Sequence, residues 1–274
     1  MIPSLSVNDF SLSGQRAIVT GASSGIGASI ARMLAAAGAQ VVINYRSGAD
    51  EAHRMVDEIT DAGGTAFAVG GDVSVEGDVV DLFQSARDLM GRLDILVSNA
   101  GLQQDAPFQD MSLAQWNKVI AVNLTGQFLC AREAVRSFFA QDFDPTTQLC
   151  AGKIICISSV HDKIPWAGHV NYAASKGGLS LMMQSVAQEL AGRKIRCNSV
   201  SPGAIKTAIN REAWATAEAE KALLKFIPYE RVGVPDDIAR VVAWLASDHS
   251  DYINGATLYV DGGMTLYPSF RFGG

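Results

Sequence analysis

Tyr172 and Lys176 lie four residues apart, and Ser159 precedes the tyrosine by thirteen residues. Side chains at this spacing share one face of a helix, so the lysine ammonium can stand beside the phenol. Free tyrosine has a pKa of about 10, so it can take a proton from an alcohol near neutral pH only if a neighbouring charge stabilises the phenolate. A serine at the end of a strand could bond the substrate oxygen as it becomes a carbonyl. Because a glycine-rich turn lies far upstream, the order of these residues predicts a hydride-transfer site.

The glycine-rich turn spans residues 20–27 and has a Gly-x-x-x-Gly-x-Gly spacing. Gly21 would permit the tight turn, Gly25 would let the backbone approach a pyrophosphate, and Gly27 would allow close packing of helix on strand. The N–H groups and the positive dipole end of the following helix favour bound phosphate. The turn therefore predicts a dinucleotide site that also includes Ser23, Ser24 and Ile26.

The end of the second predicted strand bears on the choice of nicotinamide cofactor. An acidic residue there would bind the adenosine ribose and repel a 2′-phosphate, but the chain has Arg46 and Ser47 instead. Arginine suits bidentate phosphate recognition, so NADP is favoured, and NAD remains an alternative if Arg46 is an ordinary solvated side chain. Asp72, followed by Val73 after the third strand, could accept a hydrogen bond from the adenine amino group, cap the next helix, or do both.

The elements that must position these residues follow from the hydrophobic pattern. Short apolar runs alternate with longer segments of helical periodicity, which is typical of strand–helix units around a buried parallel sheet. We therefore predict an α/β fold, a single-domain Rossmann-type doubly wound seven-stranded parallel sheet with helices on both faces. The strands are expected at residues 17–20, 40–44, 65–69, 95–98, 153–157, 196–200 and 257–260, and the helices at 25–37, 49–62, 75–90, 112–139, 172–190 and 235–246.

Composition narrows the class of protein. With 274 residues, 48% of them hydrophobic, we expect one nucleotide-binding and catalytic domain over residues 1–274. The formal net charge of -6 disfavours a nucleic-acid partner. No apolar run approaches the roughly 20 residues that cross a bilayer, and no signal peptide precedes the first strand, so we expect no membrane partner and a cytoplasmic location. The four cysteines and four histidines show no ligand spacing, so no metal is expected.

Two segments interrupt the alternation of strands and helices, and the first of them, at residues 141–152, looks like a surface insertion. Residues 206–231 carry a charged helical piece after a strand, where a substrate lid would lie, although an ordinary surface hairpin is the alternative. Residues 264–274 form a C-terminal tail.

Taken together, these residues resemble the short-chain dehydrogenase/reductase family from residue 17 to about residue 263. Residues 20–27 resemble the family's cofactor turn, and a second motif follows strand four, where Ser98 stands in place of the more common asparagine. The resemblance implies that further cofactor contacts come from Asn99, Ala100, Gly101, Pro202, Gly203, Ile205 and Thr207, and from Tyr172 and Lys176.

The resemblance also implies a catalytic tetrad of Asn123, Ser159, Tyr172 and Lys176. Tyr172 would be the base, Lys176 its activator and a ribose ligand, and Ser159 the partner of the substrate oxygen, with Ser158 as its rival. Asn123 could anchor a proton-relay water, or it could merely bond backbone where a helix bends.

Three segments, at residues 158–166, 202–205 and 261–270, are similar to the bacterial glucose 1-dehydrogenases of that family. This likeness implies a homotetramer that oxidises the anomeric hydroxyl of an aldose to the lactone. His161 could bond a sugar hydroxyl or lie at a subunit contact. Trp166 and Phe270 could stack on the sugar, or belong to core or interface.

Two other functions fit the same residues. One is a ketone reductase acting on a steroid or a 3-oxoacyl thioester. The other is a catalytically silent NADP-binding regulator, although the full tetrad argues against it.

Overall fold

The computed structural model describes residues 10–266. The strands are β1 (Arg16–Val19), β2 (Gln40–Tyr45), β3 (Thr65–Gly70), β4 (Ile95–Ser98), β5 (Gly152–Ile157), β6 (Ile195–Pro202) and β7 (Thr257–Val260). The α-helices are α1 (Gly25–Ala36), α2 (Ala49–Asp61), α3 (Glu76–Met90), α4 (Leu113–Ile120), α5 (Gly126–Ala140), α6 (Val170–Leu190), α7 (Ala217–Leu224) and α8 (Pro235–Ala246). The predicted elements are all present with small shifts at their ends, except that the helix expected over 112–139 is divided.

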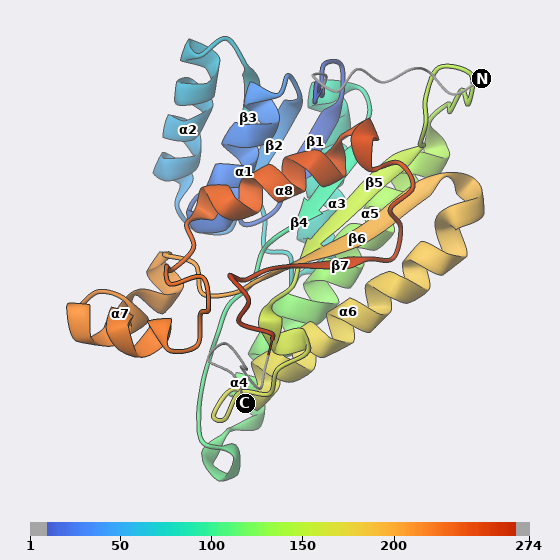
Figure 1. Cartoon of the computed structure of the whole chain (residues 1–274). Coiled ribbons are helices and arrows are strands. Elements are labelled where there is room, and N and C mark those ends of the chain that lie inside the picture. The colour runs from blue at the N-terminus through green and yellow to red at the C-terminus, as the bar shows by residue number, and fades with distance from the viewer. Residues whose placement is uncertain (1–9, 267–274) are drawn as a thin grey trace.

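The strands form one seven-stranded sheet in the order β3-β2-β1-β4-β5-β6-β7 (Figure 1). Every neighbouring pair is parallel. The chain builds outward from β1 to β3 and then returns to place β4 on the other side of β1. In such folds ligands bind at this reversal, outside the carboxyl ends of the strands. The predicted fold class is confirmed.

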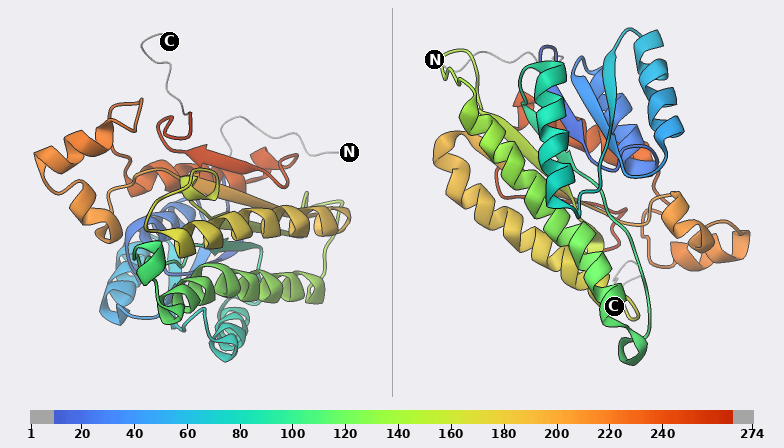
Figure 2. Two further views of the ribbon diagram at one scale, coloured as in Figure 1. Left: turned by 90° about the horizontal axis from the view of Figure 1, so that it is seen from below. Right: turned by 180° about the vertical axis from the view of Figure 1, so that it is seen from behind.

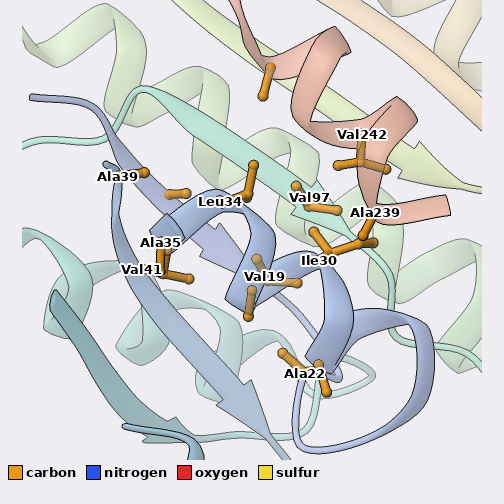
Figure 3. Packing of buried hydrophobic residues seen from close by; sticks show 14 of the residues in the cluster. Val19, Ala22, Ile30, Leu34, Ala35, Ala39, Val41, Val97, Ala239 and Val242 are labelled. Carbon is orange, nitrogen blue, oxygen red and sulfur yellow. The ribbon is translucent and has the colours of Figure 1, made fainter. Parts of the chain in front are cut away.

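Helices cover both faces of the sheet, because alternate side chains of each buried strand point to opposite faces. In β1, Ala17 and Val19 belong to the core under α1, α2 and α8, whereas Ile18 belongs to the core under α3, α5 and α6. Figure 2 shows α3, α5 and α6 together on one face. Figure 3 shows the other core, with Ile30 of α1 beside Ala239 of α8. The sheet is therefore packed against a hydrophobic core on each of its faces.

The helix predicted over residues 112–139 is interrupted by a π-helical turn at Ala121–Thr125. Its start is well specified, because Ser112 and Gln115 form a capping box before α4. In the π-turn the N–H of Gly126 donates to the carbonyl oxygen of Ala121, five residues back. A Cβ on Gly126 would lie 2.9 Å from Val73, so α5 packs closely on the turn after β3. Asn123 lies within the π-turn, where hydrophobic periodicity gives no signal of a break.

Residues 206–231 project from the carboxyl edge of the sheet (Figure 1). They contain the 3-10 segment Ala208–Ala213 and helix α7, and neither buries a residue. The Thr216 hydroxyl caps α7 by accepting from the N–H of Ala219 at 3.1 Å. These two pieces are therefore folded locally and bury no residue, whereas Ile227 near the end of the segment is buried at 2% exposure. Of the predicted tail, residues 264–266 are described, and Phe270 lies outside the described residues.

Candidate active site

A cleft of about 1410 Å³ runs along the carboxyl edge of the sheet. Turns after β1 to β6 line it, because parallel strands bring their carboxyl ends to one edge. Ordinary small-molecule pockets measure roughly 300–1,000 Å³, so this cleft has room for a dinucleotide together with a substrate. All predicted site residues except Asn123 line the cleft: Gly21, Ser23, Ser24, Gly25, Ile26, Gly27, Arg46, Ser47, Asp72, Val73, Asn99, Ala100, Gly101, Ser159, His161, Tyr172, Lys176, Pro202, Gly203, Ile205 and Thr207.

Two glycines of the first turn stand where no larger residue fits. Gly21 has a φ of +59°, and a Cβ there would lie 2.9 Å from the Cα of Ala100. A Cβ on Gly27 would lie 2.5 Å from both the Asn99 side-chain nitrogen and the Gly21 carbonyl oxygen. The turn after β1 therefore packs directly on the turn after β4, and glycine is required at both positions.

The N-terminus of α1 meets the cleft at Ser24, Gly25 and Ile26. The Ser24 hydroxyl makes no capping hydrogen bond, and the first helical turn contains no acidic residue. The N–H groups and the positive dipole end of α1 are thus available to an anion. Gly25 has a φ of +57°, which favours glycine, whereas a Cβ there would make only an ordinary contact with the Thr207 methyl group at 3.6 Å. These features fit the pyrophosphate of a dinucleotide.

Thr20 and Asn99 join the turns after β1 and β4. The Thr20 hydroxyl oxygen accepts from the N–H groups of Asn99 at 2.9 Å and Ala100 at 3.1 Å. The Asn99 amide donates to the carbonyl oxygens of Thr20 and Gly21 at 2.9 and 3.0 Å. Ser98, the departure from the family pattern, is buried, and its hydroxyl has no hydrogen-bond partner within residues 10–266. That departure leaves the Asn99 bonds intact.

Arg46 and Asp72 lie where the cleft meets β2 and β3. The Arg46 guanidinium is half exposed and stands 3.8 Å from one Asp72 carboxylate oxygen. The other oxygen accepts from the N–H and the hydroxyl of Ser74, at 2.9 and 2.6 Å. Burial would raise the Asp72 pKa, but the Ser74 bonds and Arg46 together hold it below its usual value. The idea that Asp72 caps the next helix is wrong, because α3 begins at Glu76 with Val75 as its cap residue, and Asp72 instead closes the preceding turn.

Tyr172 and Ser159 meet at the other end of the cleft. The Ser159 hydroxyl and the Gln103 amide lie close enough to the Tyr172 phenol to lower its pKa as hydrogen-bond donors. The neighbouring Ser158 hydroxyl points elsewhere and donates to the Asp162 carboxylate at 3.0 Å. The serine that stands beside the phenol is therefore Ser159.

Lys176 lies over the ring of Tyr172, with its ammonium nitrogen 5.6 Å from the ring centre. The ammonium donates to the carbonyl oxygen of Ile157 at 2.9 Å. Its burial, at 3% exposure, lowers the Lys176 pKa to about 8. Burial also raises the Tyr172 pKa; the two hydrogen bonds to the phenol oxygen offset part of this rise, and nearby Asp105 and Asp162 add to it. That Lys176 lowers the Tyr172 pKa stays a prediction, since in this structure the ammonium donates its hydrogen bond to a backbone carbonyl.

Asn123 lies behind the cleft and is completely buried. Its side-chain oxygen accepts from the N–H of Leu102 and its side-chain nitrogen donates to the Leu102 carbonyl oxygen, both at 2.9 Å. The same nitrogen donates to the Ser175 hydroxyl at 3.3 Å. A Cβ on Gly101 would lie 3.5 Å from the Asn123 oxygen and 3.7 Å from the Lys176 nitrogen, so Asn123 is close to the reacting end. Asn123 thus bonds backbone, as one of the two alternatives expected. Its part in a proton relay stays a prediction.

Trp166 is held between two imidazole rings. Its ring centre lies 4.2 Å from that of His161 and 3.5 Å from that of His169, with interplanar angles of 19° and 4°. Two nearly parallel rings this close to one centre would overlap on the same face, so they must occupy opposite faces. Both faces of Trp166 are therefore covered, so in this arrangement it has no free face for the alternative in which it stacks on a sugar.

His161 lines the cleft beside Ser159. Its Nδ1 lies 3.1 Å from the carbonyl oxygen of Ile164. Burial lowers the His161 pKa, so the ring is neutral near pH 7, and an Nδ1–H bonded to the carbonyl leaves Nε2 as an acceptor. A neutral acceptor of this kind could receive a hydrogen bond from a substrate hydroxyl.

The segment 206–231 gives the same cleft an apolar wall. Ile209 and Phe226 line the cleft and are 64% and 66% exposed, and Leu266 of the tail is 70% exposed. Leu223 and Leu224 of α7 join them. Grouped apolar side chains that remain exposed at a cleft indicate a surface that a ligand covers.

Sequence reasoning misses Gln103 and the individual lid residues. Gln103 follows Gly101 by two residues, and a polar side chain just beyond a strand at the carboxyl edge could have been placed in the cleft. The lid residues carry no such signal, because the sequence predicts the segment without its orientation.

The described residues were also compared with what a metal site or a reactive thiol requires. Within residues 10–266, no group of three or more His, Cys, Asp or Glu side chains could hold a metal ion. Burial raises the pKa of Cys130 and of Cys197 to about 12, so neither is a nucleophile near neutral pH. In that same part of the chain, no helix combines the length and apolar character needed to span a membrane.

Known proteins match the chain over almost its whole length. The family model described as enoyl-(acyl carrier protein) reductase matches residues 21–265. The 3beta-hydroxysteroid dehydrogenase 1 of Eggerthella lenta is 45% identical over 262 residues, which cover 96% of this chain and 98% of that protein. Glucose 1-dehydrogenase 2 of Bacillus subtilis is 40% identical over 259 residues, covering 94% of this chain and 97% of that protein. A crystal structure of a gluconate 5-dehydrogenase from Burkholderia cenocepacia in complex with NADP and tartrate is 34% identical, with a TM-score of 0.86 over 94% of this chain and 98% of that one.

Proposed function

The chain belongs to the short-chain dehydrogenase/reductase family, and from that premise we propose that it interconverts an alcohol and a carbonyl compound at Tyr172 with an NAD(P) cofactor. The observation that carries the proposal is the position of Ser159 beside the Tyr172 phenol in the cleft that begins at the phosphate turn. Two hydroxyls that reach each other can both reach one substrate oxygen between them.

The side chains divide the work at the substrate oxygen. When bound, the nicotinamide accepts the hydride from the alcohol carbon or returns it to the carbonyl carbon. Tyr172 takes the hydroxyl proton during oxidation and gives it back during reduction. Ser159 donates a hydrogen bond to the same oxygen, which stabilises the negative charge that develops there.

Tyr172 needs additional positive charge before it can act as a base near neutral pH, because burial raises its pKa. Lys176 can supply that charge, since with a pKa of about 8 it is mostly protonated at pH 7. Each unit by which the Tyr172 pKa falls requires about 1.4 kcal/mol of differential stabilisation. We propose that Lys176 leaves the Ile157 carbonyl for a partner nearer the phenol, such as a ribose hydroxyl, when the cleft is filled.

We propose NADP as the preferred cofactor, with NAD as the alternative. Arg46 supports this preference, because it lines the cleft after β2, where no acid would repel a 2′-phosphate. Asp72 weakens this preference, because its carboxylate stands 3.8 Å from Arg46 and would compete with a phosphate for the guanidinium. Arg46→Ala should weaken NADPH binding about tenfold and leave NADH binding nearly unchanged, as measured by fluorescence titration. Arg54→Ala, which removes an exposed arginine of α2, is the matched control.

We propose an aldose as the substrate, oxidised at its anomeric hydroxyl. The support is the likeness of residues 158–166 to glucose 1-dehydrogenases, together with the neutral His161 acceptor in the cleft wall. A sugar needs several convergent polar partners, and His161, Gln103 and Ser159 are available for this purpose.

A second candidate is a bulky apolar alcohol such as a hydroxysteroid. The observation that favours it is the apolar wall of Ile209, Leu223, Leu224, Phe226 and Leu266. A flat hydrocarbon skeleton would bury this surface, at about 25 cal/mol for each square ångström, whereas a sugar would leave most of it exposed.

A substrate panel separates these readings. The purified protein is supplied with NADP and a set of aldoses and hydroxysteroids, and reduced cofactor is followed by absorbance. Turnover of aldoses alone supports the first proposal, and turnover of hydroxysteroids alone supports the second. A protein that binds NADP and turns over neither class, nor ketones with NADPH, would be the silent regulator, and the proposed function would be wrong.

The quaternary structure is proposed from the same family resemblance, and the cellular location from the sequence. We propose a homotetramer in the cytoplasm, which light scattering would detect as a particle four times the 29.1 kDa chain mass. A monomer at micromolar concentration would contradict the assembly proposal without affecting the reaction.

A further inference from the structure

Asp162 gathers hydroxyl groups from three neighbouring strands behind the reacting end. One carboxylate oxygen accepts from Ser158, just after β5, at 3.0 Å and from Ser201 of β6 at 2.6 Å. The other accepts from the phenol of Tyr259 on β7 at 2.9 Å. Asp162 is not among the residues that line the cleft, so it acts on the reaction through other groups.

Asp162 is connected by hydrogen bonds both to the Ser159 turn and, through Ser158, to helix α6. It closes the 3-10 turn Val160–Asp162, for which Ser159 is the cap residue, and its N–H donates to the Ser159 carbonyl oxygen at 2.9 Å. The Ser158 hydroxyl that binds Asp162 also reaches the Lys176 carbonyl oxygen at 3.5 Å. A displaced carboxylate would therefore move the Ser159 turn relative to α6.

The charge of Asp162 reaches the same two side chains. Its field raises the pKa of Tyr172 and that of Lys176, because a negative charge disfavours a phenolate and favours an ammonium. The other titratable or charged groups around it are His161 and Lys163 on its own turn, and Tyr259 and Asp261 from β7 and the residue after it. Lys163 stands 5.3 Å from the centre of the Tyr259 ring.

We propose that Asp162 is a positioning residue of the hydride-transfer site, which fixes the Ser159 turn against α6 and whose negative charge opposes ionisation of Tyr172. This inference rests on the proposed function, since it gives Tyr172 the role of the base. It adds a carboxylate to the site that neither touches substrate nor belongs to the predicted tetrad.

Asp162→Asn tests the inference, because it keeps the size of the side chain and removes its charge. We expect kcat to fall about tenfold or more, and cofactor affinity to stay within about twofold. The acid limb of the pH profile for alcohol oxidation should move to lower pH by roughly half a unit, since the phenolate loses a repelling charge. Asp94→Asn is the matched control, because that carboxylate binds Arg16 and Arg92 at the opposite edge of the sheet. The control profile should superpose on that of the wild type.

Tyr259→Phe and Ser201→Ala give a second test with the carboxylate in place. Each variant removes one donor that partly neutralises Asp162, so the acid limb should move to higher pH, opposite to the shift in Asp162→Asn. These variants decide the matter if Asp162→Asn does not fold, as judged by thermal unfolding.

Superposable pH profiles in the folded variants would overturn the inference. Wild-type turnover by Tyr172→Phe would instead overturn the proposed function, so the two failures are distinguishable.

Discussion

Two buried lysines lie at opposite edges of the sheet, and they differ in their partners. Lys153 near the start of β5 is 4% exposed and donates to Asp248 at 3.0 Å and Gln15 at 2.9 Å. Lys176 at the carboxyl edge is 3% exposed and donates to the Ile157 carbonyl oxygen. Within residues 10–266, no carboxylate lies within ion-pair distance of Lys176.

The two lysines show that one edge of the sheet contributes to stability and the other edge to the reaction. An ammonium paired with a carboxylate is neutralised and contributes to holding the amino edge together. An ammonium that meets a carbonyl oxygen retains its field and the cost of its burial. The carboxyl edge therefore gives up stability in order to keep a charge beside Tyr172.

The largest expected effect comes from Lys176→Met. Loss of the ammonium should lower kcat/KM by about 100-fold or more, because Tyr172 then has no cation to favour its phenolate. The same change should raise the free energy of unfolding at pH 7 by roughly 1–3 kcal/mol, since the pKa shift from 10.5 to about 8 measures a burial cost of that order. Steady-state kinetics and urea unfolding would test the two parts, and a strong loss of stability would break the comparison.

Lys153→Met makes the identical substitution at the other edge. Turnover should stay within about twofold, because this residue is far from the cleft. The free energy of unfolding should fall by roughly 1–2 kcal/mol, since Asp248 loses its partner but is partly exposed to water. If Lys153→Met lost activity as Lys176→Met does, the assignment of stability to one edge and chemistry to the other would be wrong.

Gly27→Ala tests whether close packing of the phosphate turn at the carboxyl edge is needed for cofactor binding. The new Cβ would lie 2.5 Å from Asn99 and from the Gly21 carbonyl oxygen, so the phosphate turn must shift. We expect the dissociation constant for NADPH to rise about tenfold, measured by fluorescence titration. In Gly77→Ala the new Cβ meets nothing within 4 Å in helix α3, so this control should bind normally and gain a few tenths of a kcal/mol. Equal affinities for the two variants would count against the tight contact.

The smallest effect is a pH dependence of stability that belongs to Lys176. Its pKa is lower in the folded protein than in the unfolded chain, so between about pH 8 and 10.5 the unfolded state binds more protons. Stability contributed by this group must then rise with pH, by about 1 kcal/mol between pH 8 and pH 9. The difference in unfolding free energy between the wild type and Lys176→Met should shrink by that amount over the same interval. A constant difference would show that Lys176 is not a buried, unpaired ammonium.

Much of this architecture can be predicted from the sequence because local patterns encode it. Each buried strand is an apolar run between turn residues, and the spacing of Gly21, Gly25 and Gly27 identifies the phosphate turn. Ser159, Tyr172 and Lys176 follow from their order and spacing, and the structure brings all three to the cleft.

Other features depend on contacts between segments that are distant in the chain. The partners of Asp162 come from β6 and β7, and the direction of the Lys176 ammonium is set by the end of β5. No local sequence pattern predicts these contacts between strands and helices, so they can be seen only in the folded structure.

The most direct test of the central claim is Tyr172→Phe, which removes the phenol oxygen and leaves the ring in place. The account predicts that turnover falls at least about 100-fold, while the dissociation constant for NADPH stays within about twofold. Tyr252→Phe, at a fully exposed tyrosine, is the control and should behave as the wild type. Turnover by Tyr172→Phe near the wild-type rate would contradict the account, because Tyr172 would then not be the group that moves the proton.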